Sequence, residues 1–95
     1  MTETETSFAS VWDAIETDPA EAENMKIRAS LLRAIIKTIQ ANAWSQAECA
    51  RRLGVNQPRV SDLMRGKIDR FSIDALANFA HQIGLRLDIR IDQAA

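Results

Sequence analysis

Apolar residues recur every three or four positions along most of the chain, which is the period of an amphipathic α-helix. The longest such run follows Asp18 and Pro19 and continues to about Asn42. Asp18 is suited to cap this helix, and Pro19 fits the first helical position because its missing N–H would have no partner there. The apolar stripe expected on this helix consists of Met25, Leu32, Ile35, Ile36 and Ile39.

Two more helices are predicted towards the ends of the chain. A short amphipathic helix is expected from about Ser10 to Glu16. Another is expected to start after Ser72, which can cap it, and to end at Gly84. The apolar positions that indicate the two helices are Phe8, Val11, Trp12 and Ile15 in the first, and Ile73, Leu76, Phe79, Ala80 and Ile83 in the second.

The stretch from Ser45 to Gly66 predicts two short helices joined by a tight turn. Gln46 falls in the first turn of the first helix, where free backbone N–H groups attract phosphate. Ala50 is small enough to let a second helix cross closely, Gly54 suits a left-handed backbone after the helix, and Val60 returns the second helix to the core. These features indicate a helix-turn-helix, whose second helix usually enters the DNA major groove.

Capping signals support both short helices. Ser45 followed by Glu48 forms the pattern of a capping box, with Trp44 and Cys49 at the two positions of a hydrophobic staple. Asn56 can cap the second helix. We therefore expect Cys49 to be a small buried apolar residue, which is far more common than a reactive thiol in such a setting.

The second helix is expected to turn a polar face outward. Val60 and Leu63 share its inner side at 100° per residue. Such a face could simply be solvated, but the preceding turn and the basic loop from Lys67 to Arg70 favour DNA binding. The residues broadly opposite the inner side are Pro58, Ser61, Asp62 and Arg65, with Gln57 and Arg59 at the margins.

The pattern changes to strict alternation between Leu85 and Ile91, which predicts a half-buried strand. A lone strand leaves a row of backbone groups unpaired. Pairing with the same strand of a second copy would give a two-fold dimer. Pairing with a different protein, or with the segment from Phe8 to Trp12, is the less favoured alternative. The residues expected to mediate dimerisation are Leu85, Leu87, Ile89 and Ile91.

Charge is distributed unevenly along the 95 residues, although the formal net charge is only −1. Residues 1–24 contain seven of the 13 acidic residues and no Lys or Arg, so the remainder has a net charge of +6. A basic body with an acidic arm is compatible with DNA binding, which the whole-chain average conceals. The arm could dock onto a basic partner, or its aromatic residues could pack onto the protein's own core.

Other function classes find little support in the sequence. One Cys and one His provide neither a catalytic triad nor a metal cluster, and there is no Gly-rich phosphate loop, so we expect no enzyme activity, no metal and no cofactor. The chain lacks the pattern of a signal peptide and a membrane-spanning apolar run. We therefore expect a cytoplasmic, nucleoid-associated protein that does not contact membranes.

The stretch from Gln46 to Ile83 resembles the phage-repressor-like (XRE) helix-turn-helix family. It is most similar to a branch whose members are commonly antitoxins encoded beside a RelE/HigB-type toxin, a small basic ribonuclease. The resemblance covers about residues 10–91. The residues that recur in that branch are Gln57-Pro58-Arg59-Val60-Ser61, Leu63, Arg65-Gly66-Lys67 and Phe71-Ser72.

This resemblance implies a mainly α fold, a lambda-repressor-like bundle of about five helices with a C-terminal β-strand that pairs across a dimer. We expect an acidic arm with a short helix in residues 1–17, the DNA-binding domain in 18–84 and the dimerisation strand in 85–92. The family's DNA-contacting positions correspond to Ser45, Gln46, Asn56, Gln57, Pro58, Arg59, Ser61, Asp62, Arg65, Lys67 and Arg70.

Two of these positions depart from many phage repressors, which have glutamines where this chain has Pro58 and Asp62. Contacts of those amides with adenine are therefore lost, and Asp62 could accept a hydrogen bond from cytosine or hold an arginine in position. The expected function is a homodimeric repressor of an inverted-repeat operator in double-stranded DNA, acting as the antitoxin of a type II toxin–antitoxin pair. The alternatives are a stand-alone phage-type repressor and a protein-interaction module that does not bind DNA.

Overall fold

The computed structural model describes residues 18–93. Within this range the chain forms four α-helices and one short 3-10 turn and contains no β-strand. The elements are α2 (Pro19–Ala41), α3 (Gln46–Leu53), α4 (Gln57–Met64), η1 (Ile68–Arg70) and α5 (Ile73–Gln82). The additional helix expected from Ser10 to Glu16 lies outside the described residues, so the mainly helical architecture is confirmed with four of the five expected helices.

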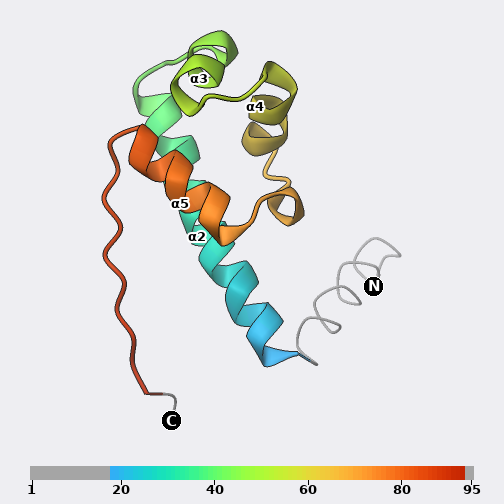
Figure 1. Cartoon of the computed structure of the whole chain (residues 1–95), viewed down its shortest axis with the longest axis vertical. Coiled ribbons are helices and arrows are strands. Elements are labelled where there is room, and N and C mark those ends of the chain that lie inside the picture. The colour runs from blue at the N-terminus through green and yellow to red at the C-terminus, as the bar shows by residue number, and fades with distance from the viewer. Residues whose placement is uncertain (1–17, 94–95) are drawn as a thin grey trace, which may run out of the picture.

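The long helix α2 supports the other elements. Asp18 caps it, its carboxylate accepting hydrogen bonds from the backbone N–H groups of Ala20 (3.2 Å) and Glu21 (3.3 Å), and Pro19 occupies the first turn as predicted. Figure 1 shows α5 lying against α2, with α3 and α4 near the C-terminal end of α2.

A single apolar cluster joins the helices. Val60 and Leu63 turn the inner side of α4 into it, with exposed fractions of 0% and 1%. Three positions of the predicted α2 stripe are buried, while Ile36 packs at the edge of the cluster. The buried members are Leu32, Ile35, Ile39, Cys49, Leu53, Val60, Leu63, Phe71, Leu76, Phe79 and Ala80.

Each of the four described α-helices is followed by one residue with a positive φ. These residues are Ala43 (53°), Gly54 (70°), Gly66 (73°) and Gly84 (87°). At Gly54 the left-handed backbone lets the N–H of Val55 bond to the carbonyl of Ala50 at 3.0 Å, which satisfies a free carbonyl at the end of α3. The predicted role of Gly54 is thus confirmed. After α2 the same geometry is formed by Ala43, a residue with a Cβ atom.

The predicted C-terminal strand is not formed in the single chain. Residues 85–93 have no regular secondary structure, since no described segment lies beside them to complete a ladder. Figure 1 shows this segment running away from the end of α5 as a single extended stretch. Of the four residues expected at a dimer contact, Leu85 packs against the core, whereas Leu87, Ile89 and Ile91 are exposed.

Candidate nucleic-acid interface

The start of α3 carries an exposed polar residue beside a well-formed cap. The hydroxyl of Ser45 accepts a hydrogen bond from the N–H of Glu48 at 3.1 Å, and Gln46 is exposed at the first helical position. The capping box predicted here is only half formed, because the carboxylate of Glu48 pairs with Arg51 and with Arg52 (2.7 Å). The hydrogen bond from Arg51 lowers the pKa of Glu48 below its usual range.

The residues predicted to form a hydrophobic staple lie close to this cap. Cys49 is buried, with 2% of its surface exposed, and burial raises the pKa of its thiol. Trp44 is half-buried against the core and stacks under the guanidinium of Arg52, 4.2 Å from the ring centre. Both observations agree with a structural role for Trp44 and Cys49.

The start of α4 presents a second exposed polar edge. The side-chain oxygen of Asn56 accepts a hydrogen bond from the N–H of Arg59 at 2.9 Å, as expected of the helix cap. Gln57 and Pro58 are exposed in the first turn and Ser61 is half-buried one turn later. The amino-terminal turn of α4 is therefore open to contact from outside the molecule.

Asp62 is engaged by two basic residues of the following loop. Its carboxylate lies 3.0 Å from the guanidinium of Arg70 and 3.5 Å from the ammonium of Lys67. Because the hydrogen bond from Arg70 stabilises the charged form, the pKa of Asp62 is lower than its usual value. Asp62 was predicted either to accept a hydrogen bond from cytosine or to hold an arginine in position. Among the described residues it contacts an arginine, Arg70.

Arg59 lies along the loop and packs on an aromatic ring. Its guanidinium carbon is 4.1 Å from the centre of the Phe71 ring, and Nη1 donates a hydrogen bond to the backbone carbonyl of Arg70 at 2.9 Å. Phe71 is itself buried and packs edge-on against Phe79, with 6.1 Å between ring centres. Arg59 therefore links α4 to the basic loop.

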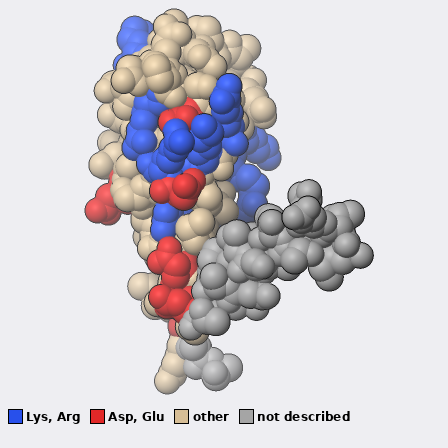
Figure 2. All heavy atoms as spheres, turned by 90° about the vertical axis from the view of Figure 1, so that its right-hand side faces the viewer, with Lys and Arg blue, Asp and Glu red and all other residues tan. Residues whose placement is uncertain are grey.

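These contacts create one continuous basic surface. Figure 2 shows Lys and Arg side chains gathered around a few acidic ones on the face that carries α4 and η1. Arg65 is exposed at the end of α4, next to the loop that supplies Lys67 and Arg70. The charged residues between Gln57 and Arg70 are Arg59, Arg65, Lys67 and Arg70 with Asp62 and Asp69, a net charge of +2.

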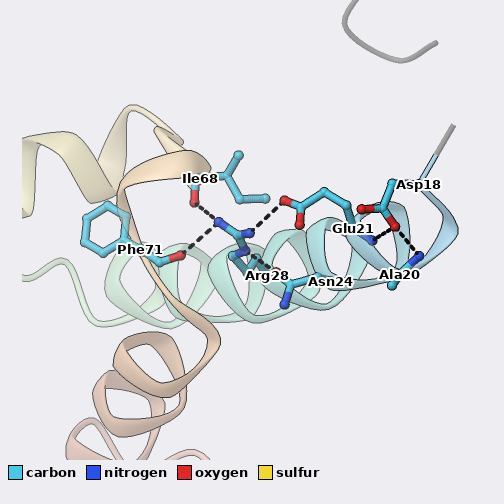
Figure 3. A network of polar contacts seen from close by, with 7 residues as sticks. All are labelled: Asp18, Ala20, Glu21, Asn24, Arg28, Ile68 and Phe71. Carbon is cyan, nitrogen blue, oxygen red and sulfur yellow. Dashed lines mark hydrogen bonds and ion pairs between the residues drawn. The ribbon is translucent and has the colours of Figure 1, made fainter. Parts of the chain in front are cut away.

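A residue that the sequence did not indicate, Arg28 of α2, braces this loop from behind. Figure 3 shows its guanidinium between the backbone carbonyls of Ile68 and Phe71, both at 3.5 Å, and the carboxylate of Glu21 at 3.4 Å. Its Nε also donates to the side chain of Asn24. Only 15% of the Arg28 side chain is exposed. The sequence shows only that Arg28 is a basic residue on a helix with an apolar stripe. This does not identify Ile68, which lies 40 residues further along the chain.

The residues predicted to contact DNA fall into three groups. Gln46, Gln57, Pro58 and Arg65 are exposed and Ser61 is half-buried, and Arg65 forms no ion pair among the described residues. Ser45 and Asn56 are occupied as caps, and Arg59, Asp62, Lys67 and Arg70 form the linked cluster.

Residues 18–93 contain no group of three or more His, Cys, Asp or Glu arranged to hold a metal ion. None of the helices in this range is both long and apolar enough to cross a membrane.

Comparisons with known proteins point in one direction. The model of a family described as a helix-turn-helix domain matches residues 15–92. A solved structure of a protein whose name assigns it to the XRE family of transcriptional regulators is similar over 78% of this chain and 83% of its own, with 32% sequence identity and a TM-score of 0.72. No curated protein matches the sequence.

Proposed function

This chain belongs to the helix-turn-helix domain family, and from that premise we propose that it is a DNA-binding transcriptional regulator that acts as a repressor. The observation that supports this most directly is the basic surface formed by α4 and η1 beside the exposed start of α4 (Figure 2). In helix-turn-helix proteins, the second helix of the motif contacts base edges in the major groove with its amino-terminal residues. Membership of the family also agrees with the expectation that the protein is not an enzyme.

The proposed contacts divide into those that read bases and those that fix position. Gln57 and Ser61 of α4 and Arg65 directly after it are assigned to base edges, since Gln57 and Arg65 are exposed and Ser61 is partly exposed. Gln46 binds a phosphate through the free N–H groups at the start of α3. Lys67 and Arg70 contact the phosphate backbone from the loop and contribute affinity without sequence information.

The regulator is proposed to act as a two-fold dimer joined by its C-terminal segments. Residues with alternating apolar character between Leu85 and Ile91 support this, because Leu87, Ile89 and Ile91 are exposed in the single chain. A two-fold dimer requires an operator that is an inverted repeat. The centres of its half-sites would lie about 34 Å apart, one turn of DNA.

We propose further that the repressor is the antitoxin of a type II toxin–antitoxin pair and represses its own operon. The resemblance to the antitoxin branch, from Gln57 to Ser72, supports this role, as does the acidic composition of residues 1–24. An acidic arm would attract a basic RelE/HigB-type toxin and speed their encounter. Co-expression with the product of the neighbouring gene tests it: a complex formed by residues 1–95 and lost with residues 17–95 assigns the contact to the arm.

The decisive experiment for DNA binding is a footprint on the protein's own promoter, combined with a salt titration of binding to that fragment and to a scrambled one. A protected inverted repeat and tighter binding to the promoter would support the proposal. An interaction module that uses the fold without DNA would give no salt-dependent binding to either fragment. A stand-alone phage-type repressor would give the footprint but would form no complex with the neighbouring gene product.

A further inference from the structure

The C-terminal segment has two chemically distinct faces. Leu87, Ile89 and Ile91 are 41%, 80% and 89% exposed. On the alternate positions Arg86 pairs with Asp88 (3.8 Å) and Arg90 with Asp92 (3.2 Å). Contacts between residues two apart require both side chains to lie on the same side of an extended backbone. The segment therefore already has an apolar face and a charged face before any partner is present.

Pairing this segment with its own copy allows only a few registers. In an antiparallel two-fold pair, residues directly opposite each other have sequence numbers with a constant sum, and both point to the same face. An odd sum would set every apolar residue opposite a charged one, which disrupts both faces. The sum must therefore be even, so one residue lies opposite its own copy.

The charges exclude half of the remaining registers. If Asp88 faced its own copy, Arg86 would lie opposite Arg90, so both cross-strand pairs would join like charges. If Arg90 faced its own copy, Asp88 would lie opposite Asp92. Like charges directly opposite each other destabilise a sheet. An apolar residue must therefore lie at the centre.

Because Leu85 packs against the core, three apolar centres remain, and Ile89 uses the segment most completely. Ile89 at the centre sets Arg86 opposite Asp92, Asp88 opposite Arg90 and Leu87 opposite Ile91. Every charged residue then faces one of opposite sign, and every exposed apolar residue faces another. A centre at Leu87 leaves Ile91 opposite Ile83, which directly follows α5, and a centre at Ile91 sets Ile89 opposite Gln93.

We propose that two copies of this chain pair their C-terminal segments in an antiparallel ribbon with Ile89 on the two-fold axis. This inference rests on the proposed dimeric function and adds its register. The occupant of the exposed apolar face is a second copy because the charge pattern from Arg86 to Asp92 is complementary to itself. The apolar face of the ribbon is continuous with Leu85, which already packs against the core, so it faces the two helical bodies.

Single cysteines introduced at exposed positions test this register by disulfide formation. Directly opposed residues in an antiparallel pair have Cα atoms about 4.5–5.5 Å apart, within the range of a disulfide. Ile89→Cys should therefore form a disulfide-linked dimer by itself. Leu87→Cys and Ile91→Cys should each stay unlinked, because each lies about 14 Å from its own copy, and should cross-link when the two variants are mixed. The native chain is the control, since its one cysteine, Cys49, is buried.

The outcomes separate failure of the register from failure of the dimer. Self-linking of Leu87→Cys or of Ile91→Cys would show that the axis lies elsewhere, with the dimer intact. A native chain that sediments as a dimer while Ile89→Cys remains unlinked would also overturn the register. A native chain that sediments as a monomer would overturn both the dimer and the register. Each substitution is at an exposed position, so loss of folding does not confuse the result.

Discussion

The carboxylate of Asp62 on α4 lies 3.0 Å from the guanidinium of Arg70 on the loop that follows it. The same carboxylate is 3.5 Å from the ammonium of Lys67. Asp62, on the proposed recognition helix, thus pairs with the two basic residues that we propose contact the DNA backbone. If these cations bind phosphate as proposed, phosphate must displace Asp62 from them, and we therefore expect Asp62 to oppose binding to any sequence.

Asp62→Asn should strengthen binding to random DNA, because Lys67 and Arg70 are released for phosphate. We expect the affinity for a scrambled fragment to rise several-fold, while the slope of log affinity against log salt changes little, because Lys67 and Arg70 contact phosphate in both proteins. Fluorescence anisotropy across a salt series measures both quantities. The matched control is Asp69→Asn, which removes the same charge from the loop that follows α4, at a residue that forms no ion pair among residues 18–93.

A different outcome would assign Asp62 to base reading. If Asp62→Asn weakened binding to the operator alone and left the scrambled fragment unchanged, the carboxylate would be acting on a cytosine amine. Equal gains from Asp62→Asn and Asp69→Asn would reduce the effect to net charge.

The ionisation of Asp62 should depend on its contact with Arg70. A hydrogen bond from a guanidinium favours the carboxylate, so the pKa of Asp62 in the folded protein should lie below its ordinary value of 3.8. A lowered folded pKa means that the pair contributes stability above pH 3.8 and loses it as pH falls through the lower value. Carboxyl NMR titration should show the pKa rising back towards 3.8 in Arg70→Gln. An unchanged pKa in that variant would argue that the contact is not maintained in solution.

The proposed division between positioning and reading residues predicts two different losses. Lys67→Ala should weaken binding to all sequences and reduce the salt slope by about 1. Gln57→Ala should cost roughly 1–3 kcal/mol on the operator and little on other DNA. Titrations of both variants against operator and scrambled fragments make the comparison. Equal weakening on the two fragments by both variants would contradict the assignment.

Arg28 should affect DNA binding without touching DNA. Replacing it with Gln removes the guanidinium that contacts the carbonyls of Ile68 and Phe71, so the loop should loosen and the domain should lose about 1–2 kcal/mol of stability. Faster hydrogen exchange at the Phe71 amide, together with several-fold weaker DNA binding, would show that Arg28 positions the loop. Arg33→Gln, an exposed site on the same helix, should change neither. Weaker binding without faster exchange would instead suggest a direct phosphate contact.

The sequence was sufficient for features decided within a few residues. The caps at Asp18 and Asn56, the left-handed turn at Gly54 and the inward side of α4 depend on local backbone groups and helical spacing. Contacts between residues far apart in the sequence could not be predicted in this way. Neither the stacking of Arg59 on Phe71 nor the bracing of the loop by Arg28 leaves a periodic signal, since the partners are 12 and about 40 residues apart.

The C-terminal segment illustrates a different limit. Alternation from Leu85 to Ile91 specifies an extended backbone with two faces, and the ion pairs of Arg86 and Arg90 agree with this. A strand also requires a hydrogen-bonded neighbour, which a period of two cannot supply. Glu48 also shows that spacing alone does not determine a contact. Its spacing from Ser45 fits a capping box, but its carboxylate pairs with Arg51 and Arg52 instead.

Ala43 offers a route to a more stable domain. It has a φ of 53° after α2. The N–H of Ala43 donates to the carbonyl of Gln40 at 3.1 Å, and the N–H of Trp44 donates to the carbonyl of Ile39 at 3.3 Å. This is the left-handed end that other helices of the chain form with glycine, and a Cβ atom there costs about 1–2 kcal/mol. Ala43→Gly should therefore raise the free energy of unfolding by about 0.5–1 kcal/mol, after the greater freedom of glycine in the unfolded chain is deducted.

Gly54→Ala makes the reverse change at φ 70° with no atom within 4 Å of the added Cβ, so it should destabilise by a similar amount through backbone strain alone. Urea denaturation of the two variants measures both shifts, and a loss of stability in Ala43→Gly would show that the backbone at Ala43 is not strained in solution.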